Sequence, residues 1–166
     1  DAAQFFFTPT LVNTGAELVL FDTGLNGAGI TAALAAAGYT PDDVNVVVLT
    51  HMHGDHIGGL TGDDGSPTFP NARYVTGSTE YDHWAGAGNE GFDAKVRPLA
   101  EQTEMLSGGG AVTSGIAAAT RKSLLGMMAS EKMPFIGYHM PFPAIGYVRD
   151  RGGQYEYQPM SYQLMI

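Results

Sequence analysis

Three histidines and one aspartate lie within six positions of a short segment, LTHMHGDHIGGL, at residues 49–60. They are His51, His53, Asp55 and His56, and the chain has only five histidines in all. Imidazole and carboxylate are the ligands that zinc or iron takes without thiolates, and this chain has no cysteine. A single tetrahedral ion does not need four ligands from one loop, so the spacing suits two neighbouring ions. The first two histidines would serve one ion, and the aspartate and the last histidine the other. A polar loop whose histidines only form hydrogen bonds is the less favoured alternative.

A buried strand is expected directly before this motif. Residues 44–50, VNVVVLT, form a continuous apolar run of strand length, which suits a strand buried on both faces. Side chains two positions apart on an extended chain point to the same side, so His51 and His53 should face together. The glycines that follow allow the backbone to turn closely after the strand. The sequence therefore predicts that the end of a buried strand presents the motif.

Strands and helices alternate along the rest of the chain, which predicts an α/β fold in a single domain over residues 1–166. Helices are expected at residues 29–40, 78–86 and 117–133. Strands are expected on either side of a turn at residues 13–15, at residues 72–77, 111–116 and 135–140, and near the end at residues 154–162.

Composition limits the classes of partner. The formal net charge is −9 and the pI is about 4.7, which argues against nucleic acid or an anionic membrane surface, since both attract basic proteins. No apolar run is long enough to span a bilayer, so we expect a soluble protein. The chain begins at Asp1 rather than at a methionine, and a removed leader would be consistent with secretion or a periplasmic location. The compartment is left open.

The motif THMHGDHIGGL resembles the signature of the metallo-β-lactamase superfamily, whose members are mostly hydrolases with two metals. Two further segments are similar: LVNTGAELVLFDTG, which ends near Asp22, and GYHMPFPAIGYV, which contains His139. The segment HMPFP and the C-terminal segment QYEYQPMSY most resemble sequences of the branch that contains methyl parathion hydrolase-like and quorum-quenching-lactonase-like enzymes. This resemblance implies an αβ/βα sandwich with the metals at the sheet edge.

The resemblance also implies roles for individual residues. His51 and His53 would bind the first of two divalent ions, most often zinc, with manganese, cobalt or iron as alternatives. Asp55 and His56 would bind the second ion together with His139, and Asp55 would also orient the attacking hydroxide. Asp22 would lie behind the ligands and orient one of them. An apolar substrate mouth is expected at three aromatic residues: Trp84, Phe142 and Phe135.

Two expected metal ligands of the family are absent from this sequence. A third histidine should follow His56, and a bridging aspartate should come later, but the only histidine between His56 and His139 is His83, in a helical context. The strand at residues 111–116 also runs directly into the helix expected from Ala117. We therefore expect that the natural chain is longer and that its strands between Ile116 and Ala117 are omitted from this sequence; the alternative is that the natural protein itself lacks them.

Three functional hypotheses follow from these observations. The first is a dinuclear hydrolase that uses a metal-bridging hydroxide on small lactones, esters or organophosphate triesters. The alternative is a truncated, hydrolytically weak remnant that binds metal with only part of the site. A third chemistry on the same scaffold, such as oxidoreduction with a flavin domain, finds no support in the sequence. A homodimer is left open.

Overall fold

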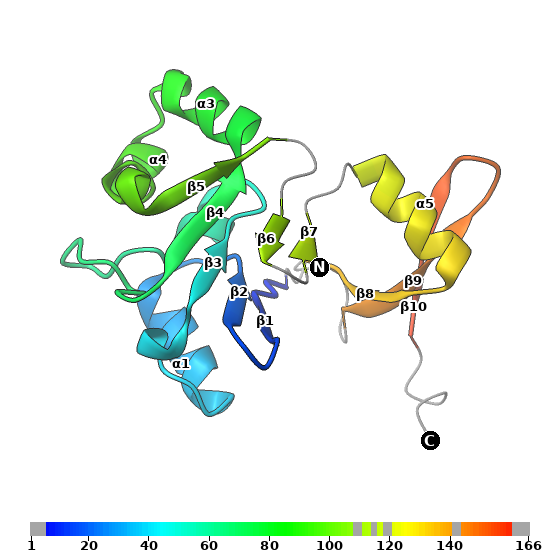
Figure 1. The fold of residues 1–166 in the computed structure, drawn as a ribbon, viewed down its shortest axis with the longest axis horizontal. Coiled ribbons are helices and arrows are strands. Elements are labelled where there is room, and N and C mark those ends of the chain that lie inside the picture. The colour runs from blue at the N-terminus through cyan, green and yellow to red at the C-terminus, as the bar shows by residue number, and fades with distance from the viewer. Residues whose placement is uncertain (1–5, 108–110, 114–115, 118–120, 141–143, 161–166) are drawn as a thin grey trace, which may run out of the picture. The chain divides into compact units, whose positions relative to one another are not determined.

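The computed structural model describes residues 6–107, 111–113, 116–117, 121–140 and 144–160 (Figure 1). The chain forms two compact units, one made of residues 9–118 and the other of residues 1–8 and 119–166. Within the described ranges, no helix is both long and apolar enough to cross a bilayer.

A five-stranded sheet forms the centre of the first unit, in the order β1-β2-β3-β4-β5. Its strands are β1 (Thr10–Asn13), β2 (Leu18–Phe21), β3 (Val46–Val48), β4 (Arg73–Gly77) and β5 (Thr103–Leu106). The first two strands are antiparallel, and the pairs β2–β3, β3–β4 and β4–β5 are parallel. The carboxyl ends of four neighbouring strands therefore meet at one edge of the sheet.

Helices and short 3₁₀ segments connect these strands. They are α1 (Gly27–Ala36), η1 (Pro41–Asp43), α2 (Gly54–Ile57), α3 (Ser78–Ala87), α4 (Glu90–Lys95) and η2 (Arg97–Gln102). The side chain of Asn26 caps α1 by accepting a hydrogen bond from the N–H of Gly29. Gly38 adopts a left-handed φ of 84° just after this helix, a conformation that glycine commonly supplies at a helix end.

The central strands of the first unit's sheet are packed on both faces. On one face, β2, β3 and β4 side chains pack with apolar residues of α1, α3 and α4, among them Ile30, Tyr81 and Phe92. On the other face, Val19, Val46, Val48 and Val75 form a second cluster. Every residue of β3 is buried, as its continuous apolar sequence predicts. The motif at residues 51–56 therefore starts from a strand that packing fixes on both sides.

The predicted boundary between Ile116 and Ala117 is wrong in its local structure. Both residues belong to strand β7 (Ile116–Ala117), which pairs antiparallel with β6 (Ala111–Thr113). Helix α5 begins only at Arg121 and ends at Glu131. The alanines of residues 117–119 favour a helix, but pairing with β6 overrides that preference at Ala117. Whether chain is missing at this seam in the natural protein stays a prediction.

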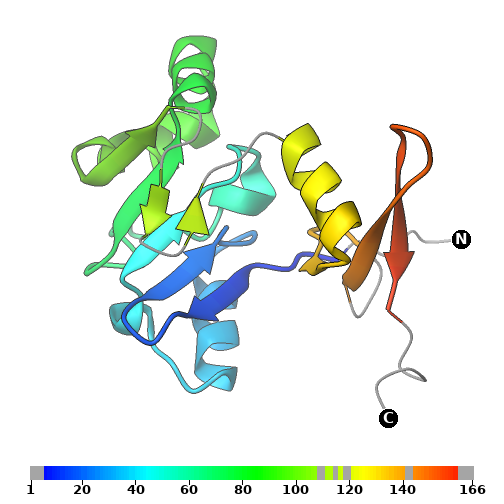
Figure 2. The ribbon, with the colours of Figure 1, turned by 45° about the vertical axis from the view of Figure 1, so that its right-hand side comes forward.

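The second unit places α5 (Arg121–Glu131) against a three-stranded antiparallel sheet (Figure 2). The strands lie in the order β10-β9-β8, with β8 at Pro134–Ile136, β9 at Ile145–Asp150 and β10 at Tyr155–Pro159. The predicted helix ends at Glu131 rather than at Met133, because Lys132 adopts a left-handed φ of 52°. His139 follows β8 in a turn, with a φ of 63°.

Candidate metal site

The candidate site of the first unit lies where β2, β3 and β4 end. Asp22 follows β2, the loop with His51 and His53 follows β3, and Glu80 lies in the first turn of α3, directly after β4. Because these strands are parallel neighbours, their carboxyl ends bring the three segments together. Ligand sites of open α/β sheets form at this edge for the same reason.

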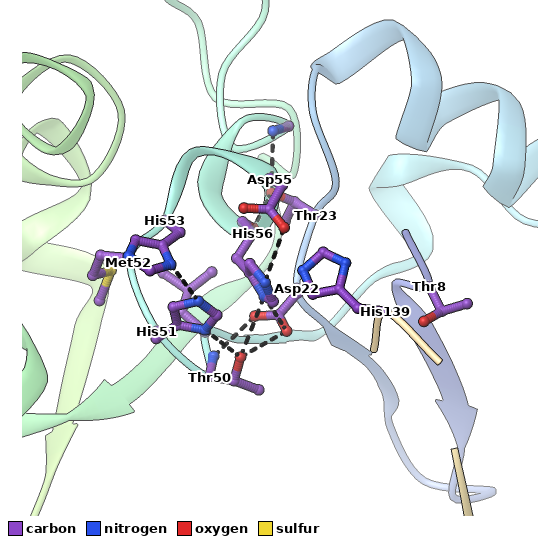
Figure 3. Close-up of polar contacts among 12 residues, drawn as sticks. Thr8, Asp22, Thr23, Thr50, His51, Met52, His53, Asp55, His56 and His139 are labelled. Carbon is purple, nitrogen blue, oxygen red and sulfur yellow. Dashed lines mark hydrogen bonds and ion pairs between the residues drawn. The ribbon is translucent and has the colours of Figure 1, made fainter. Parts of the chain in front are cut away.

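A buried methionine sets the direction of the first two histidines. Met52 is 1% exposed and belongs to the hydrophobic core. Residues on either side of a buried side chain in extended backbone face the opposite way, so His51 and His53 turn away from the core. Their rings meet edge to face, and Nε2 of His51 lies 3.0 Å from Nδ1 of His53 (Figure 3). The expectation that these two side chains face together is confirmed.

His56 is the buried histidine of the motif, only 2% exposed, in the short helix α2. Its Nδ1 lies 2.8 Å from Oδ2 of Asp22, and its Nε2 lies 3.2 Å from Oδ2 of Asp55. Its ring centroid is 3.8 Å from that of His51. Asp55 and His56 therefore join the pair formed by His51 and His53 in one cluster of four side chains.

Asp22 connects the two segments of this cluster, the loop with His51 and the helix with His56. Its Oδ1 accepts a hydrogen bond from the backbone N–H of Thr50, and its Oδ2 accepts one from the hydroxyl of the same threonine, at 2.9 and 2.8 Å. Thr50 directly precedes His51, so these bonds hold the loop. The contact of Asp22 with His56 holds the helix. Asp22 is 2% exposed and has a left-handed φ of 59°, a conformation that aspartate tolerates better than most residues.

A second clamp comes from the next residue of the same turn. The backbone N–H and the hydroxyl of Thr23 both donate to the carbonyl oxygen of His56, each at 2.8 Å. The hydroxyl of Thr23 in turn accepts a hydrogen bond from the N–H of Gly59. A Cβ added at Gly59 would lie 2.3 Å from the carbonyl oxygen of Thr23, so only glycine fits this close approach.

The donor atoms fit the bonding of a divalent metal. Two nitrogens on one tetrahedral zinc ion lie about 3.3 Å apart, given bonds of about 2.0–2.1 Å. The 3.0 Å between the ring nitrogens of His51 and His53 and the 3.2 Å between His56 and Asp55 are close to that spacing. With Nδ1 of His56 donating to Asp22, its Nε2 carries the lone pair and faces Asp55.

The environment of His51 keeps its ring ready to act as a ligand. Burial, followed by the nearby rings of His56 and His53, lowers the pKa of His51 from its ordinary value of 6.5. Asp22 and Glu80 act in the opposite direction but do not reverse the shift. A metal requires a neutral imidazole, so a lowered pKa extends the pH range in which His51 can bind one.

His139 lies in the other unit, so its participation in this site stays a prediction. Within that unit, Nδ1 of His139 lies 3.1 Å from the carbonyl oxygen of Phe6. Its ring also meets the ring of Phe7 edge to face, with centroids 5.6 Å apart. A proton on Nδ1 would donate to Phe6 and place the lone pair on Nε2, as metal-binding histidines commonly do.

The three aromatic residues predicted to line a substrate mouth have different positions. Trp84 lies in α3 with its ring 5.6 Å from that of His53, nearly perpendicular to it. Phe135 lies in β8 of the second unit, where it lines an apolar cavity of about 590 Å³ and meets the ring of Tyr157. Phe142 lies outside the described residues. Within the first unit, Trp84 thus lies beside the candidate ligand His53, and the place of Phe135 and Phe142 at a substrate mouth stays a prediction.

Sequence reasoning did not identify Thr50, Thr23 or Glu80 as parts of this site. Glu80 accepts a hydrogen bond from the backbone N–H of Met52 at 3.1 Å and one from the indole of Trp84 at 2.7 Å. The spacing of Glu80 and Trp84, four residues apart on a helix, was the one available signal. The contact with Met52 joins residues 28 positions apart and has no local signature.

The family model described as the metallo-beta-lactamase superfamily matches residues 8–121 of the chain. This match covers more than half of the sequence and includes the whole cluster around His51 and Asp22. The chain belongs to the metallo-beta-lactamase superfamily. Its α/β fold, with a mixed sheet and helices, is the fold of that family. The predicted fold class is thereby confirmed.

Two of the solved structures that are similar to this superfamily member align with most of its length. One is AidC, a dizinc quorum-quenching lactonase in complex with a product, at 19% identity and a TM-score of 0.71. The other is the hydrolase AbOPH of the beta lactamase superfamily, at 20% identity and a TM-score of 0.74. In both cases 92% of this chain aligns with 78% of the other. At this level of identity the likeness shows the fold alone.

Among proteins of known sequence, the chain is similar to exodeoxyribonuclease WalJ of Streptococcus pneumoniae, with 39% identity over 49 residues. That segment is 30% of this chain and only 18% of the nuclease. The chain therefore spans a small part of the length of this relative, and the match supports the family rather than a shared activity.

Proposed function

We propose that this protein is a metal-dependent hydrolase that acts on small lactones, carboxylic esters or organophosphate triesters. One observation carries the proposal: His51, His53, Asp55 and His56 converge at the carboxyl edge of the sheet, with Asp22 buried behind them. A cluster of three imidazoles and a carboxylate, with close donor spacing, suits a divalent cation better than a structural role.

We propose two ions, most often zinc, with manganese, cobalt or iron as alternatives. His51 and His53 would hold one, and Asp55, His56 and His139 the other. When bound, such ions supply Lewis acidity and activate water for attack. Asp55 would both hold a metal and accept a hydrogen bond from the attacking water, which orients it. Asp22 would keep the proton of His56 on Nδ1 and so preserve its ligand tautomer.

The substrate class is argued from the walls of the site and from the related folds. Trp84 places an apolar ring beside His53, and such a ring suits an acyl chain or an aromatic leaving group. AidC is a dizinc quorum-quenching lactonase, and its fold is similar to this one. We therefore assign the chain to the branch of lactonase-like and methyl parathion hydrolase-like enzymes, with Trp84, Phe135 and Phe142 lining the substrate mouth.

The test is removal and return of metal. Exhaustive chelation should abolish hydrolysis of an N-acyl homoserine lactone, an activated ester or a phosphotriester, and added Zn²⁺, Mn²⁺ or Co²⁺ should restore it. Replacing Asp55 with alanine should lower kcat by orders of magnitude, because a ligand and the water-orienting group are lost together. Asp63→Ala, at an exposed aspartate on the loop after the motif, is the matched control and should keep wild-type activity. Full activity after chelation would rule out the metal mechanism.

A truncated remnant with weak hydrolysis is the second candidate. The sequence favours it, because the third histidine expected for the first metal is absent. His83 is the one histidine between His56 and His139, and it is an exposed residue of α3 outside any ligand motif. Intact mass of the natural protein distinguishes the candidates. A mass well above 17.5 kDa would support missing chain near the seam at Ile116 and Ala117, together with the absent ligands. A mass of 17.5 kDa and fewer than two ions per chain would favour the remnant.

A further inference from the structure

Glu80 differs from an ordinary surface glutamate in what its carboxylate contacts. A single oxygen, Oε1, accepts both the backbone N–H of Met52 and the indole N–H of Trp84. The first donor belongs to the peptide that joins His51 to Met52, between the two candidate ligands. The second belongs to the ring that stands 5.6 Å from the ring of His53.

The location of Glu80 favours a fixed geometry for its carboxylate. It is the third residue of α3, in the first helical turn, where the helix dipole stabilises a negative charge. Trp84 lies one turn later on the same face of the helix, within reach of the carboxylate. Hydrogen bonds to a charged acceptor are shorter and about twice as strong as neutral ones.

These contacts tie two parts of the site to one atom. The peptide N–H fixes the backbone from which His51 and His53 project, and the indole N–H fixes the apolar ring beside them. Met52 secures the same peptide from the other side, because its side chain is in the core. Movement of the ligand loop and movement of Trp84 are therefore coupled through Glu80.

We propose that Glu80 is a positioning residue, whose Oε1 holds the ligand loop at His51 and His53 and the indole of Trp84 in one fixed arrangement. This inference rests on the proposed function, since the loop is taken to bind metal. It makes metal affinity at the two histidines depend on a carboxylate that acts through the backbone N–H of Met52, between them. The same carboxylate sets the orientation of the apolar wall.

The chain supplies its own reporter, because Trp84 is its only tryptophan. Fluorescence anisotropy and acrylamide quenching of the metal-free protein measure how firmly this indole is held. Quenching by Co²⁺ measures binding at the neighbouring His53, and competition with a chelating dye gives the affinity. Far-UV circular dichroism and the Tm confirm that each variant is folded.

Two conservative variants separate the effect of the length of the Glu80 side chain from the effect of its charge. Glu80→Gln keeps the reach and an acceptor oxygen but removes the charge, whereas Glu80→Asp keeps the charge but withdraws the oxygen by one methylene. Glu80→Asp and Glu80→Ala should weaken Co²⁺ binding by about 10-fold to 100-fold, the usual loss for a group that supports metal ligands. Both should also lower the anisotropy of Trp84. Glu80→Gln should stay within about fivefold of the wild type, since a neutral acceptor makes weaker bonds.

Glu90→Ala is the matched control, because it removes an exposed glutamate from the first turn of the next helix, α4. It should change neither signal. Wild-type Co²⁺ affinity in Glu80→Asp, or equal losses in Glu80→Gln and Glu80→Asp, would overturn the positioning role alone. A wild-type protein that binds no Co²⁺ would overturn the proposed function and the positioning role with it. If Glu80→Ala does not fold, the comparison of the two conservative variants still decides.

Discussion

Replacing Asp22 with alanine should destabilise the metal-free protein strongly. The carboxylate receives the N–H and the hydroxyl of Thr50 and lies 2.8 Å from Nδ1 of His56, in an environment where it is 2% exposed. Alanine would leave these polar groups without their acceptor. It would also have to adopt the left-handed φ of 59°, which costs about 1–2 kcal/mol for a residue with a Cβ.

The size of the effect follows from these contacts. A buried donor left without an acceptor costs about 1–3 kcal/mol, which applies to Nδ1 of His56, and each hydrogen bond to a charged group contributes about 1.5–3 kcal/mol, which applies to the two bonds from Thr50. The terms overlap, so the expected loss is about 3–5 kcal/mol. For a chain of this length, each kcal/mol shifts the Tm by about 2–4 °C, which predicts a decrease of roughly 6–20 °C.

Thermal unfolding in EDTA, followed by circular dichroism, measures this change without any contribution from metal. Asp63→Ala removes an exposed aspartate and should shift stability by less than about 0.5 kcal/mol. Asp22→Asn keeps one acceptor oxygen and the tolerance for a left-handed φ, so it should fall between alanine and the wild type. A Tm for Asp22→Ala equal to that of the control would refute the view that Asp22 holds the motif together.

Three further outcomes are expected. Gly59→Ala should destabilise the protein by more than about 2 kcal/mol, because the added Cβ would meet the carbonyl oxygen of Thr23 at 2.3 Å. The control is Gly54→Ala, whose added Cβ would meet nothing within 4 Å and which should be tolerated. Urea unfolding compares the free energies of unfolding of the two variants. In the metal-free protein, NMR titration should give His51 a midpoint below 6.5, and a midpoint at or above 6.5 would contradict the burial argument. Because the unfolded chain then binds the proton of His51 at higher pH than the folded chain, this residue should lower stability as the pH falls through 6.5 and contribute no loss above it. Tyr74, whose pKa burial raises to about 12, should ionise last in a spectrophotometric titration, and Tyr74→Phe should remove that late step.

The order of polar and apolar residues predicted secondary structure correctly where strand pairing and packing favour the same conformation. The apolar run at residues 44–50 predicted a strand buried on both faces, and β3 is fully buried. β5 was not predicted, because TEML has no alternation of polar and apolar residues and forms an edge strand through its pairing with β4. The helix expected from Ala117 was wrong for a similar reason, since strand pairing outweighed alanine's helix preference.

The candidate site was predicted as far as its ligands are close in sequence. His51, His53, Asp55 and His56 lie within six residues, and the structure brings their side chains together. The contact of Asp22 was expected only through family resemblance, since it joins positions far apart in the chain. Glu80 escaped prediction because its role depends on the parallel pairing of β3 with β4, which no spacing in the sequence reveals.

The burial of Met52 makes the ligand loop part of the cooperative unit that unfolds with the core. Taking this side chain out of the core would cost about 1.5–3 kcal/mol, so local unfolding of the loop alone is unfavourable by at least that free energy. The arrangement of ligands consequently exists only in the folded state, and a metal that binds there raises the free energy of unfolding by RT ln(1 + [L]/Kd). Thermal shifts measured at a series of concentrations would then rank Zn²⁺, Mn²⁺ and Co²⁺ by affinity with no substrate in hand.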